Sequence, residues 1–104
     1  MNEIIVLTTT DSIELAHKIA SALVEKREAA CVNIIPEIRS VYRWEGKICD
    51  EKEFLLVIKS TVQRLEAVKD RVRSLHTYQT PEVISIPVSG GDPAYLSWLH
   101  ASVE

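Results

Sequence analysis

The segment from residue 30 to residue 60 constrains this chain more than any other part of its sequence. Apolar and polar residues alternate along two runs that flank Glu45-Gly46-Lys47. A period of two is typical of β-strands, so we expect a β-hairpin. We predict a three-residue loop in which Gly46 adopts a positive φ. The resulting register pairs apolar residues on one face: Trp44 with Ile48, Ile38 with Phe54, and Ile34 with Ile58.

The length of this hairpin predicts how the protein assembles. An arm of about 13 residues at roughly 3.3 Å each spans about 43 Å, whereas a globule of about 100 residues is roughly 30–35 Å across. The arms should therefore protrude and carry Tyr42, Trp44 and Ile48 to the tip. Because soluble proteins normally cover a long apolar edge, we expect a second copy of the chain to cover this one. We predict a homo-oligomer with these three residues at its interface.

Length and composition place the chain in a broad class. Its 104 residues suffice for one domain, which we take to span residues 1–104. A formal net charge of −3 argues against a nucleic-acid-binding surface, which is usually basic. No apolar run approaches the roughly 20 residues of a membrane span, and the first residues lack the pattern of a signal peptide. We expect a cytoplasmic protein that binds neither nucleic acid nor membrane.

Two helices and two strands are predicted outside the hairpin, followed by a terminal helix. Capping boxes at Asp11/Glu14 and Ser60/Gln63 indicate where the first two helices begin. The predicted elements are a strand over 3–9, a helix from Asp11, the hairpin, a helix from Ser60 to about Leu75, a strand over 82–88 and a helix capped by Asp92. Pro36 lies inside the first hairpin arm and cannot donate to a ladder, which predicts an edge strand or a bulge.

The order of these elements predicts an α+β fold. Two βαβ halves in the order βαββαβ form a four-stranded antiparallel sheet with two helices on one face. This arrangement is the ferredoxin-like sandwich, here with a long protruding hairpin and an extra C-terminal helix. We expect the open face of the sheet to be covered by the terminal helix and by neighbouring subunits.

No catalytic or metal-binding signature stands out in the chain. It lacks CxxC, HxxxH, a Walker loop, GxGxxG and GxSxG. The densest group of reactive side chains is the segment 76–82, at a predicted helix C-terminus. There His76 either bonds free helix carbonyls or, with Glu82, binds a soft metal or a small anion. No nucleophile or orienting carboxylate accompanies His76, so we do not expect an enzyme.

Aromatic side chains and one lysine suggest a second kind of site. Tyr42, Trp44 and Trp98 either line a pocket or pack between subunits, since aromatic residues with a polar group favour interfaces. Lys59, near the end of the second hairpin arm, either faces solvent or attracts an anion into a cleft.

Several stretches together resemble the CutA family of divalent-cation tolerance proteins. They are EKREAACVNIIPEIRSVYRWEGKI, EFLLVIKST, HTYQTPEVISIPV and YLSWL, and they cover nearly the whole chain. The AAC-x-N start of the hairpin, its S-x-Y-x-W-x-G-x-I tip and the H-x-Y-x-x-P-E loop occur in that order. The resemblance implies a compact, stable homotrimer of ferredoxin-like subunits, similar in architecture to the PII signalling proteins.

The resemblance also implies a function in tolerance of copper and other divalent cations. Copper-binding members carry a cysteine where this chain has Thr8 and a second histidine where it has Leu75, so His76 alone remains of that set. We therefore expect a non-enzymatic homotrimer that requires no cofactor and binds Cu²⁺ or another divalent cation weakly near subunit interfaces, through His76 and Glu82.

The alternative is a PII-like signalling protein. It would bind a small anionic ligand in a cleft between subunits, and the residues predicted to line that cleft are Lys59, Tyr78, Trp44 and Trp98.

Overall fold

The computed structural model describes residues 2–104. Its elements follow the predicted order of strand, helix, hairpin, helix, strand and terminal helix. They are β1 (Glu3–Thr10), α1 (Ile13–Glu25), β2 (Cys31–Trp44), β3 (Lys47–Thr61), a 3₁₀ turn (Val62–Arg64), α2 (Leu65–Leu75), β4 (Ile84–Pro87) and α3 (Pro93–Ser102).

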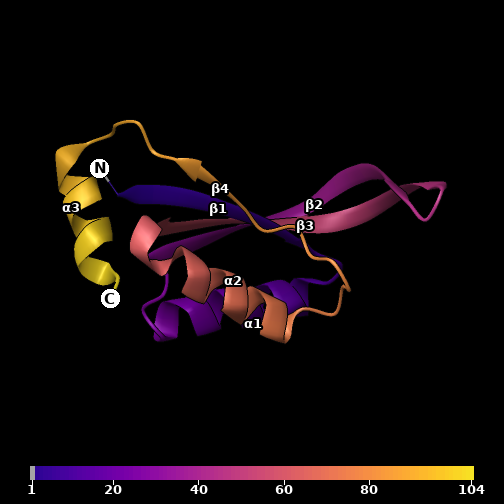
Figure 1. Cartoon of the computed structure of the whole chain (residues 1–104), viewed down its shortest axis with the longest axis horizontal. Coiled ribbons are helices and arrows are strands. Elements are labelled where there is room, and N and C mark those ends of the chain that lie inside the picture. The colour runs from indigo at the N-terminus through magenta and orange to yellow at the C-terminus, as the bar shows by residue number, and fades with distance from the viewer. Residues whose placement is uncertain (1) are drawn as a thin grey trace.

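The four strands form one sheet in the order β2-β3-β1-β4, with every neighbouring pair antiparallel. Helices α1 and α2 lie side by side on one face of this sheet, whereas α3 stands at the end of the molecule opposite the hairpin tip (Figure 1). The predicted α+β architecture with a four-stranded antiparallel sheet is confirmed. No helix among residues 2–104 is long and apolar enough to cross a membrane.

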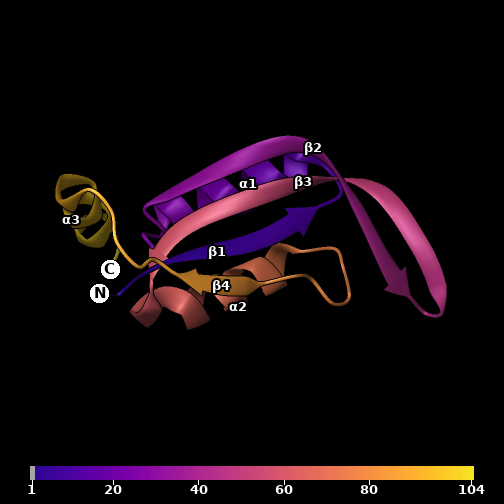
Figure 2. The same cartoon turned by 90° about the horizontal axis from the view of Figure 1, so that it is seen from above.

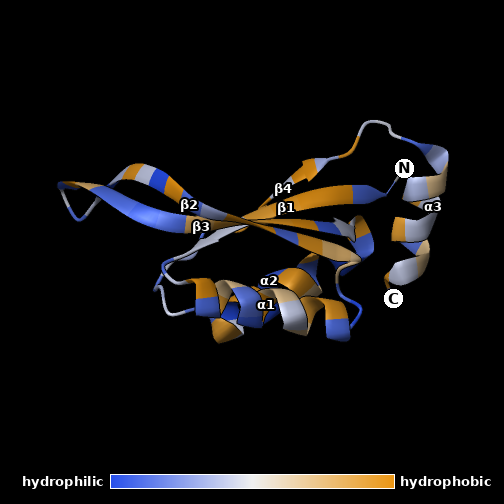
Figure 3. Cartoon of the chain, turned by 180° about the vertical axis from the view of Figure 1, so that it is seen from behind, coloured by the Kyte–Doolittle hydropathy of each residue, from blue (hydrophilic) through white to orange (hydrophobic). Residues whose placement is uncertain are grey.

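The core lies between the central strands and the two covering helices. From the sheet, β1 and β3 contribute the fully buried Val6, Leu56 and Ile58. The helices α1 and α2 present apolar residues at helical spacing, as predicted, and the fully buried ones are Ala16, Ile19, Leu23, Val68 and Val72. The hydropathy colouring in Figure 3 shows β1 and the inner part of the hairpin as apolar, whereas the outer arm of β3 is hydrophilic.

The hairpin closes with a two-residue turn, so the predicted three-residue loop is wrong. Trp44 pairs with Lys47, and Glu45 and Gly46 between them adopt φ values of 49° and 79°. Positive φ at both central residues is the geometry of a type I′ turn, whose twist matches that of the flanking strands. Ile48 consequently pairs with Arg43 and lies on the opposite face of the hairpin from Trp44.

A β-bulge at Pro36-Glu37 changes the register between the two halves of the hairpin. Ile35 pairs with Leu55 but Ile38 pairs with Glu53, so β2 contains one extra residue. Two further predicted pairs are also wrong: the two-residue turn places Ile38 opposite Glu53, and beyond the bulge Ile34 lies opposite Leu56. Glu37 takes a φ of 62°, and the missing N–H of Pro36 falls on the edge strand, as the sequence predicts.

The helix starts differ from the predictions in two of three cases. Ser12, not Asp11, caps α1, and its hydroxyl accepts from the amide of Leu15 at 3.1 Å. Ser60 belongs to β3, where its buried hydroxyl donates to the carbonyl of Glu28 at 2.6 Å and so takes no part in a capping box. The predicted cap of α3 is correct, since Asp92 accepts from the amide of Tyr95 at 3.1 Å.

The outer hairpin extends well beyond the two covering helices and bends to one side (Figure 2). The chain measures 44 × 25 × 22 Å, which is elongated for a chain of this length. Two apolar side chains on the outer hairpin are among the most exposed, Val41 at 67% and Ile48 at 64%. The protrusion predicted from the length of the arms is therefore present.

The turn geometry predicts that Gly46→Ala destabilises the protein. A Cβ at φ +79° is strained although no atom lies within 4 Å of it, so we expect a loss of about 1–2 kcal/mol. Gly90→Ala is the matched control, because its Cβ also meets nothing within 4 Å and no positive φ is required there. Urea denaturation should show a clear loss for the first variant only; equal effects would contradict the turn.

Candidate functional site

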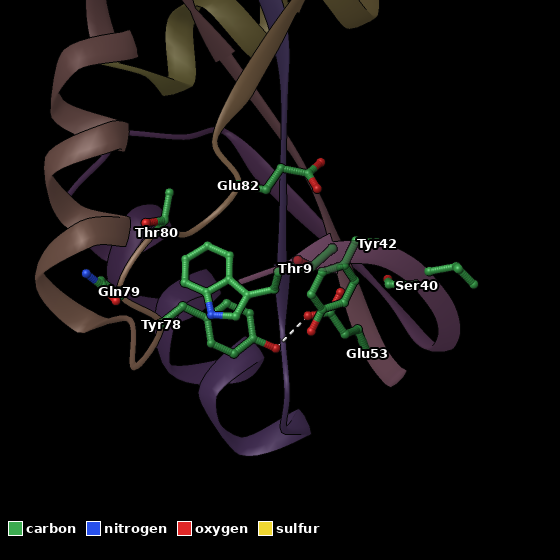
Figure 4. A pocket seen from close by; sticks show the side chains of 10 residues that line it. Thr9, Ser40, Tyr42, Glu53, Tyr78, Gln79, Thr80 and Glu82 are labelled. Atoms are coloured by element: carbon green, nitrogen blue, oxygen red, sulfur yellow. Dashed lines mark hydrogen bonds between the residues drawn. The ribbon is translucent and has the colours of Figure 1, made fainter. Parts of the chain in front are cut away.

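A cavity of about 500 Å³ lies between the outer half of the hairpin and the loop that follows α2. Its walls come from β1, from both hairpin strands and from residues 78–82, which are far apart in the sequence. The lining residues are Thr9, Ser40, Val41, Tyr42, Trp44, Glu53, Tyr78, Gln79, Thr80 and Glu82. Figure 4 shows these side chains grouped around the cavity.

The two-residue turn and the bulge in β2 together determine which side chains share this wall. Because Ile38 pairs with Glu53, the odd-numbered residues of β3 lie on the same face as the even-numbered residues of outer β2. Glu53 therefore shares a face with Tyr42 and Trp44. In the register predicted from the sequence it would lie on the opposite face, which is why sequence reasoning missed this residue.

Glu53 is the most deeply placed charged group of the cavity. Glu53 is only 5% exposed. The hydroxyl of Tyr78 donates a hydrogen bond to Oε2 of Glu53 at 2.5 Å (Figure 4). A hydrogen bond to a charged acceptor is stronger than a neutral one. Burial, and then this hydrogen bond to Glu53, raise the pKa of Tyr78 well above its ordinary value, so the phenol remains a donor.

His76 holds the loop in place rather than facing the cavity. Its Nε2 lies 2.7 Å from the carbonyl oxygen of Thr9 in β1, and its Nδ1 accepts from the backbone amide of Tyr78 at 3.1 Å. These two bonds fix the neutral tautomer with the proton on Nε2. Its ring also lies 4.5 Å, centroid to centroid, from the ring of Tyr78. His76 thus bonds a strand carbonyl rather than the free carbonyls of its own helix.

The electrostatic character of the cavity is acidic. Two of its ten lining residues are the carboxylates Glu53 and Glu82, and none is a lysine, arginine or histidine. Partial burial, and then the neighbouring charge of Glu53, raise the pKa of Glu82 above its ordinary value. The cavity is thus a place where negative charge is costly and where a cation would be stabilised.

The structure brings together only some of the predicted site residues. Tyr42, Trp44, Tyr78 and Glu82 line the one cavity, whereas Ile48 lies on the other face of the hairpin. The sequence reasoning missed six lining residues: Thr9, Ser40, Val41, Glu53, Gln79 and Thr80. Four of them lie inside the S-x-Y-x-W-x-G-x-I and H-x-Y-x-x-P-E motifs, whereas Thr9 and Glu53 carry no signal in the sequence.

Lys59 and Trp98 lie at the far end of the same chain. Lys59 is six positions from Glu53 along β3, a distance of about 20 Å along a strand. The ammonium of Lys59 bonds the side chain of Asn33 and lies 3.9 Å from the sulfur of Cys31.

Trp98 lies in α3, where its ring packs 5.5 Å from the ring of Tyr95, centroid to centroid. Burial, and then the neighbouring Cys31, raise the pKa of Tyr95 above its ordinary value. Within one chain, Lys59 and Trp98 do not share a cleft with Trp44 and Tyr78.

The predicted metal contacts do not form a ligand cluster within the chain. Among residues 2–104, no group of three or more His, Cys, Asp or Glu side chains is arranged to hold a metal ion. To bind a metal, His76 would have to release either the Thr9 carbonyl or the Tyr78 amide. Thr8, where the family resemblance led us to look for a cysteine ligand, is buried, and its hydroxyl has no hydrogen-bond partner among residues 2–104. A metal contact through His76 and Glu82 stays a prediction.

Comparison with known proteins decides the family. The sequence profile of the CutA1 divalent ion tolerance protein matches residues 4–102. The chain belongs to this CutA family. It is 46% identical over 98 residues to the divalent-cation tolerance protein CutA of Thermus thermophilus, covering 94% of this chain and 95% of that protein. The chain spans about half the length of some other relatives. It is 47% identical to the CutA protein of Mus musculus, and the match covers 92% of this chain and 54% of the mouse protein.

Solved structures of CutA proteins have the same fold as this chain. The structure from Thermus thermophilus superposes with a TM-score of 0.96 at 44% identity, covering 98% of this chain and 99% of that one. The CutA structure from Xylella fastidiosa gives a TM-score of 0.97 at 36% identity, with complete coverage of both chains. The bulged hairpin and the loop that frame the cavity therefore belong to a fold shared across the family.

The environment of Glu82 predicts how stability depends on pH. The pKa of Glu82 is raised in the folded protein, so folding favours the protonated carboxyl. The contribution of this group to the free energy of unfolding is fully present below its pKa in the unfolded chain and is lost as pH rises through its pKa in the folded chain. Glu82→Gln removes the charge at every pH. We expect this variant to melt at a higher temperature than the wild type at pH 7, and the difference to vanish below about pH 4.

Glu66→Gln is the control for this experiment. Glu66 is exposed on α2 and pairs with Lys69 at 3.0 Å, so its loss should bring no gain at pH 7. Calorimetric melting curves between pH 4 and pH 7 measure both effects. A Glu82→Gln variant with no advantage at neutral pH would contradict the assignment.

Proposed function

We propose that this protein acts in the tolerance of divalent metal ions as a non-enzymatic homotrimer of ferredoxin-like subunits. Membership of the CutA family carries this proposal, because the relative from Thermus thermophilus is named a divalent-cation tolerance protein and spans nearly the same length. The strand order β2-β3-β1-β4 with α1 and α2 on one face is consistent with the ferredoxin-like assignment and with the likeness to PII proteins. The proposed location is cytoplasmic.

The surface of the single chain supports self-assembly. Within residues 2–104, the edge strands β2 and β4 each have a strand partner on one side only, and unprotected edges favour pairing with another chain. Apolar side chains are exposed along the hairpin and along β4, notably Val41, Ile48, Ile84 and Ile86. Exposed apolar side chains of this kind are typical of subunit interfaces. We assign Tyr42, Trp44 and Ile48 to the trimer interface.

The proposed metal contact is weak and lies near a subunit interface. His76 and Glu82 sit at the two ends of the loop that borders the acidic cavity, and Glu82 lines the cavity itself. One imidazole and one carboxylate are too few for tight binding of Cu²⁺, so further ligands would come from a neighbouring chain. Cu²⁺ or another divalent cation is the proposed ligand, and no cofactor is required.

A small anion is the alternative ligand, and the charge distribution restricts where it could bind. The acidic cavity disfavours an anion near Trp44 and Tyr78. Lys59 lies at the other end of the chain, next to the helix that carries Trp98. A PII-like cleft built from all four residues would therefore combine Lys59 and Trp98 of one subunit with Trp44 and Tyr78 of another.

Light scattering tests the assembly. We expect a mass about three times the 11.7 kDa of one chain at micromolar concentration. Ile48→Asp should reduce this mass while leaving the fold of the chain intact, because Ile48 is 64% exposed on the single chain. Val24→Asp is the control, since Val24 is also exposed but lies on α1. A stable wild-type monomer would refute the trimer.

Calorimetric titration with Cu²⁺ tests the metal contact. Wild type should bind weakly, and His76→Ala and Glu82→Gln should each weaken binding by about tenfold or more. His17→Ala is the control, because His17 is exposed on α1. Circular dichroism must show that His76→Ala still folds, since it loses two hydrogen bonds to backbone. Equal binding by the wild type and both site variants would remove His76 and Glu82 as ligands.

A further inference from the structure

The carboxylate of Glu3, at the start of β1, lacks the partners that a buried charge needs. Its side chain is only 10% exposed. Among residues 2–104, its Oε1 is the one buried carboxylate oxygen that has no hydrogen-bond partner. Burying a carboxylate is costly unless hydrogen bonds or a positive charge compensate it. Glu3 is therefore a candidate ligand for a cation, and the proposed function does not use it.

The basic side chain paired with Glu3 is His100 of α3. Its Nδ1 lies 3.8 Å from Oε2 of Glu3, which is too far for a direct hydrogen bond. Imidazole nitrogens and carboxylate oxygens bind Zn²⁺ at about 2.0–2.2 Å, so two such ligands on one ion lie about 3–4 Å apart. The observed separation is thus too long for a hydrogen bond and suitable for a shared metal ion.

Glu3 and His100 face a common cavity of about 340 Å³ between β1 and α3. The start of β1 lies beside α3, at the end of the molecule opposite the hairpin tip (Figure 1). The lining residues are Glu3, Leu96, Ser97, His100 and Ala101. This lining contains a carboxylate, an imidazole and a hydroxyl but no lysine or arginine, so the cavity suits a cation better than an anion.

Both ligands belong to elements that the rest of the chain holds in place. The carbonyl of Glu3 accepts from the amide of Val88 at 3.1 Å, next to β4. The guanidinium of Arg27 donates to the carbonyls of Ala101 at 2.9 Å and Ser102 at 3.3 Å, and so fixes the last turn of α3. A site on fixed elements keeps its ligands in position before the ion binds.

None of the residues assigned to the trimer interface lines this cavity. Tyr42, Trp44 and Ile48 are on the hairpin. On α3, His100 is two positions from Trp98, which is about 200° around a helix. A neighbouring subunit that covers Trp98 would therefore contact a different side of α3 from the one that carries His100.

We propose that Glu3 and His100 bind a divalent transition-metal ion. Oε2 and Nδ1 are the protein ligands, and water completes the coordination, so binding is weak and reversible. Zn²⁺ and Cu²⁺ accept imidazole with carboxylate, whereas Mg²⁺ and Ca²⁺ prefer oxygen ligands alone. A site with two protein ligands agrees with the lack of a larger ligand group among residues 2–104. The inference goes beyond the contact proposed at His76 and Glu82 and does not depend on it.

Imidazole NMR on the full-length wild type tests this site directly, because the chain contains only three histidines. We expect Zn²⁺, added at about pH 7.5 where imidazole is mostly neutral, to shift the Nδ1 resonance of His100. The His100→Ala variant assigns that resonance. His17 is exposed on α1 and should not respond. The Zn²⁺ concentration at half-saturation of the shift measures affinity at this site alone.

Variants at other residues show which groups hold the ion. Glu3→Gln should raise the half-saturating Zn²⁺ concentration at His100 by about tenfold or more, because it removes the charged ligand. Glu66→Gln is the matched control, since Glu66 is an exposed carboxylate on α2. His76→Ala removes the other proposed contact. Both of these variants should match the wild type at His100.

Three results would overturn the proposal. A His100 resonance that does not move at saturating Zn²⁺ would exclude the site while leaving the contact at His76 and Glu82 untouched. Equal half-saturation in Glu3→Gln and the wild type would show that the imidazole binds Zn²⁺ without the carboxylate. Weaker binding at His100 in His76→Ala would show that the two sites are one, formed between neighbouring copies.

Discussion

One extra residue in an edge strand controls the functional half of this molecule. The bulge at Pro36-Glu37 shifts the pairing of β2 with β3 by one, and because side chains alternate along a strand, that shift exchanges faces for the rest of the hairpin. The inner half keeps Ile34 opposite Leu56 over the helices, whereas the outer half places Glu53 beside Tyr42 and Trp44. A bulge also bends its strand, which is consistent with the bend of the hairpin in Figure 2.

Two polar contacts join the loop after α2 to the sheet and so complete the cavity. His76 joins it to the carbonyl of Thr9, and Tyr78 joins it to the carboxylate of Glu53. Both contacts link residues more than 20 positions apart in the chain. The reactive groups of the loop are therefore fixed by their neighbours, and the groups left to face a ligand are the carboxylates and the rings.

Charge is distributed unevenly between the two ends of the chain. The hairpin end holds the acidic cavity with Glu53 and Glu82, and the other end holds Lys59 beside Cys31 and the aromatic pair of α3. A trimer that brings the tip of one hairpin to the opposite end of a neighbour would join these two regions. The acidic and the basic groups of one chain thus lie at opposite ends of it.

The sequence by itself determined the order of the elements, the apolar stripes of α1 and α2, and the family. It also predicted the cap at Asp92, the protruding hairpin and the irregularity at Pro36. Each of these features depends on local chemistry or on the spacing of motifs. Only the tertiary structure decided the register of the hairpin, since Pro36 signals a bulge or an edge without saying which partner shifts. It also decided the roles of Ser12, Ser60 and His76, whose hydrogen-bond partners depend on neighbouring elements. In the sequence, Glu53 has the pattern of a solvent-facing strand residue. It is the buried acid of the cavity because Tyr78 of the loop after α2 bonds its carboxylate and because the bulge in β2 turns Tyr42 and Trp44 onto the same face.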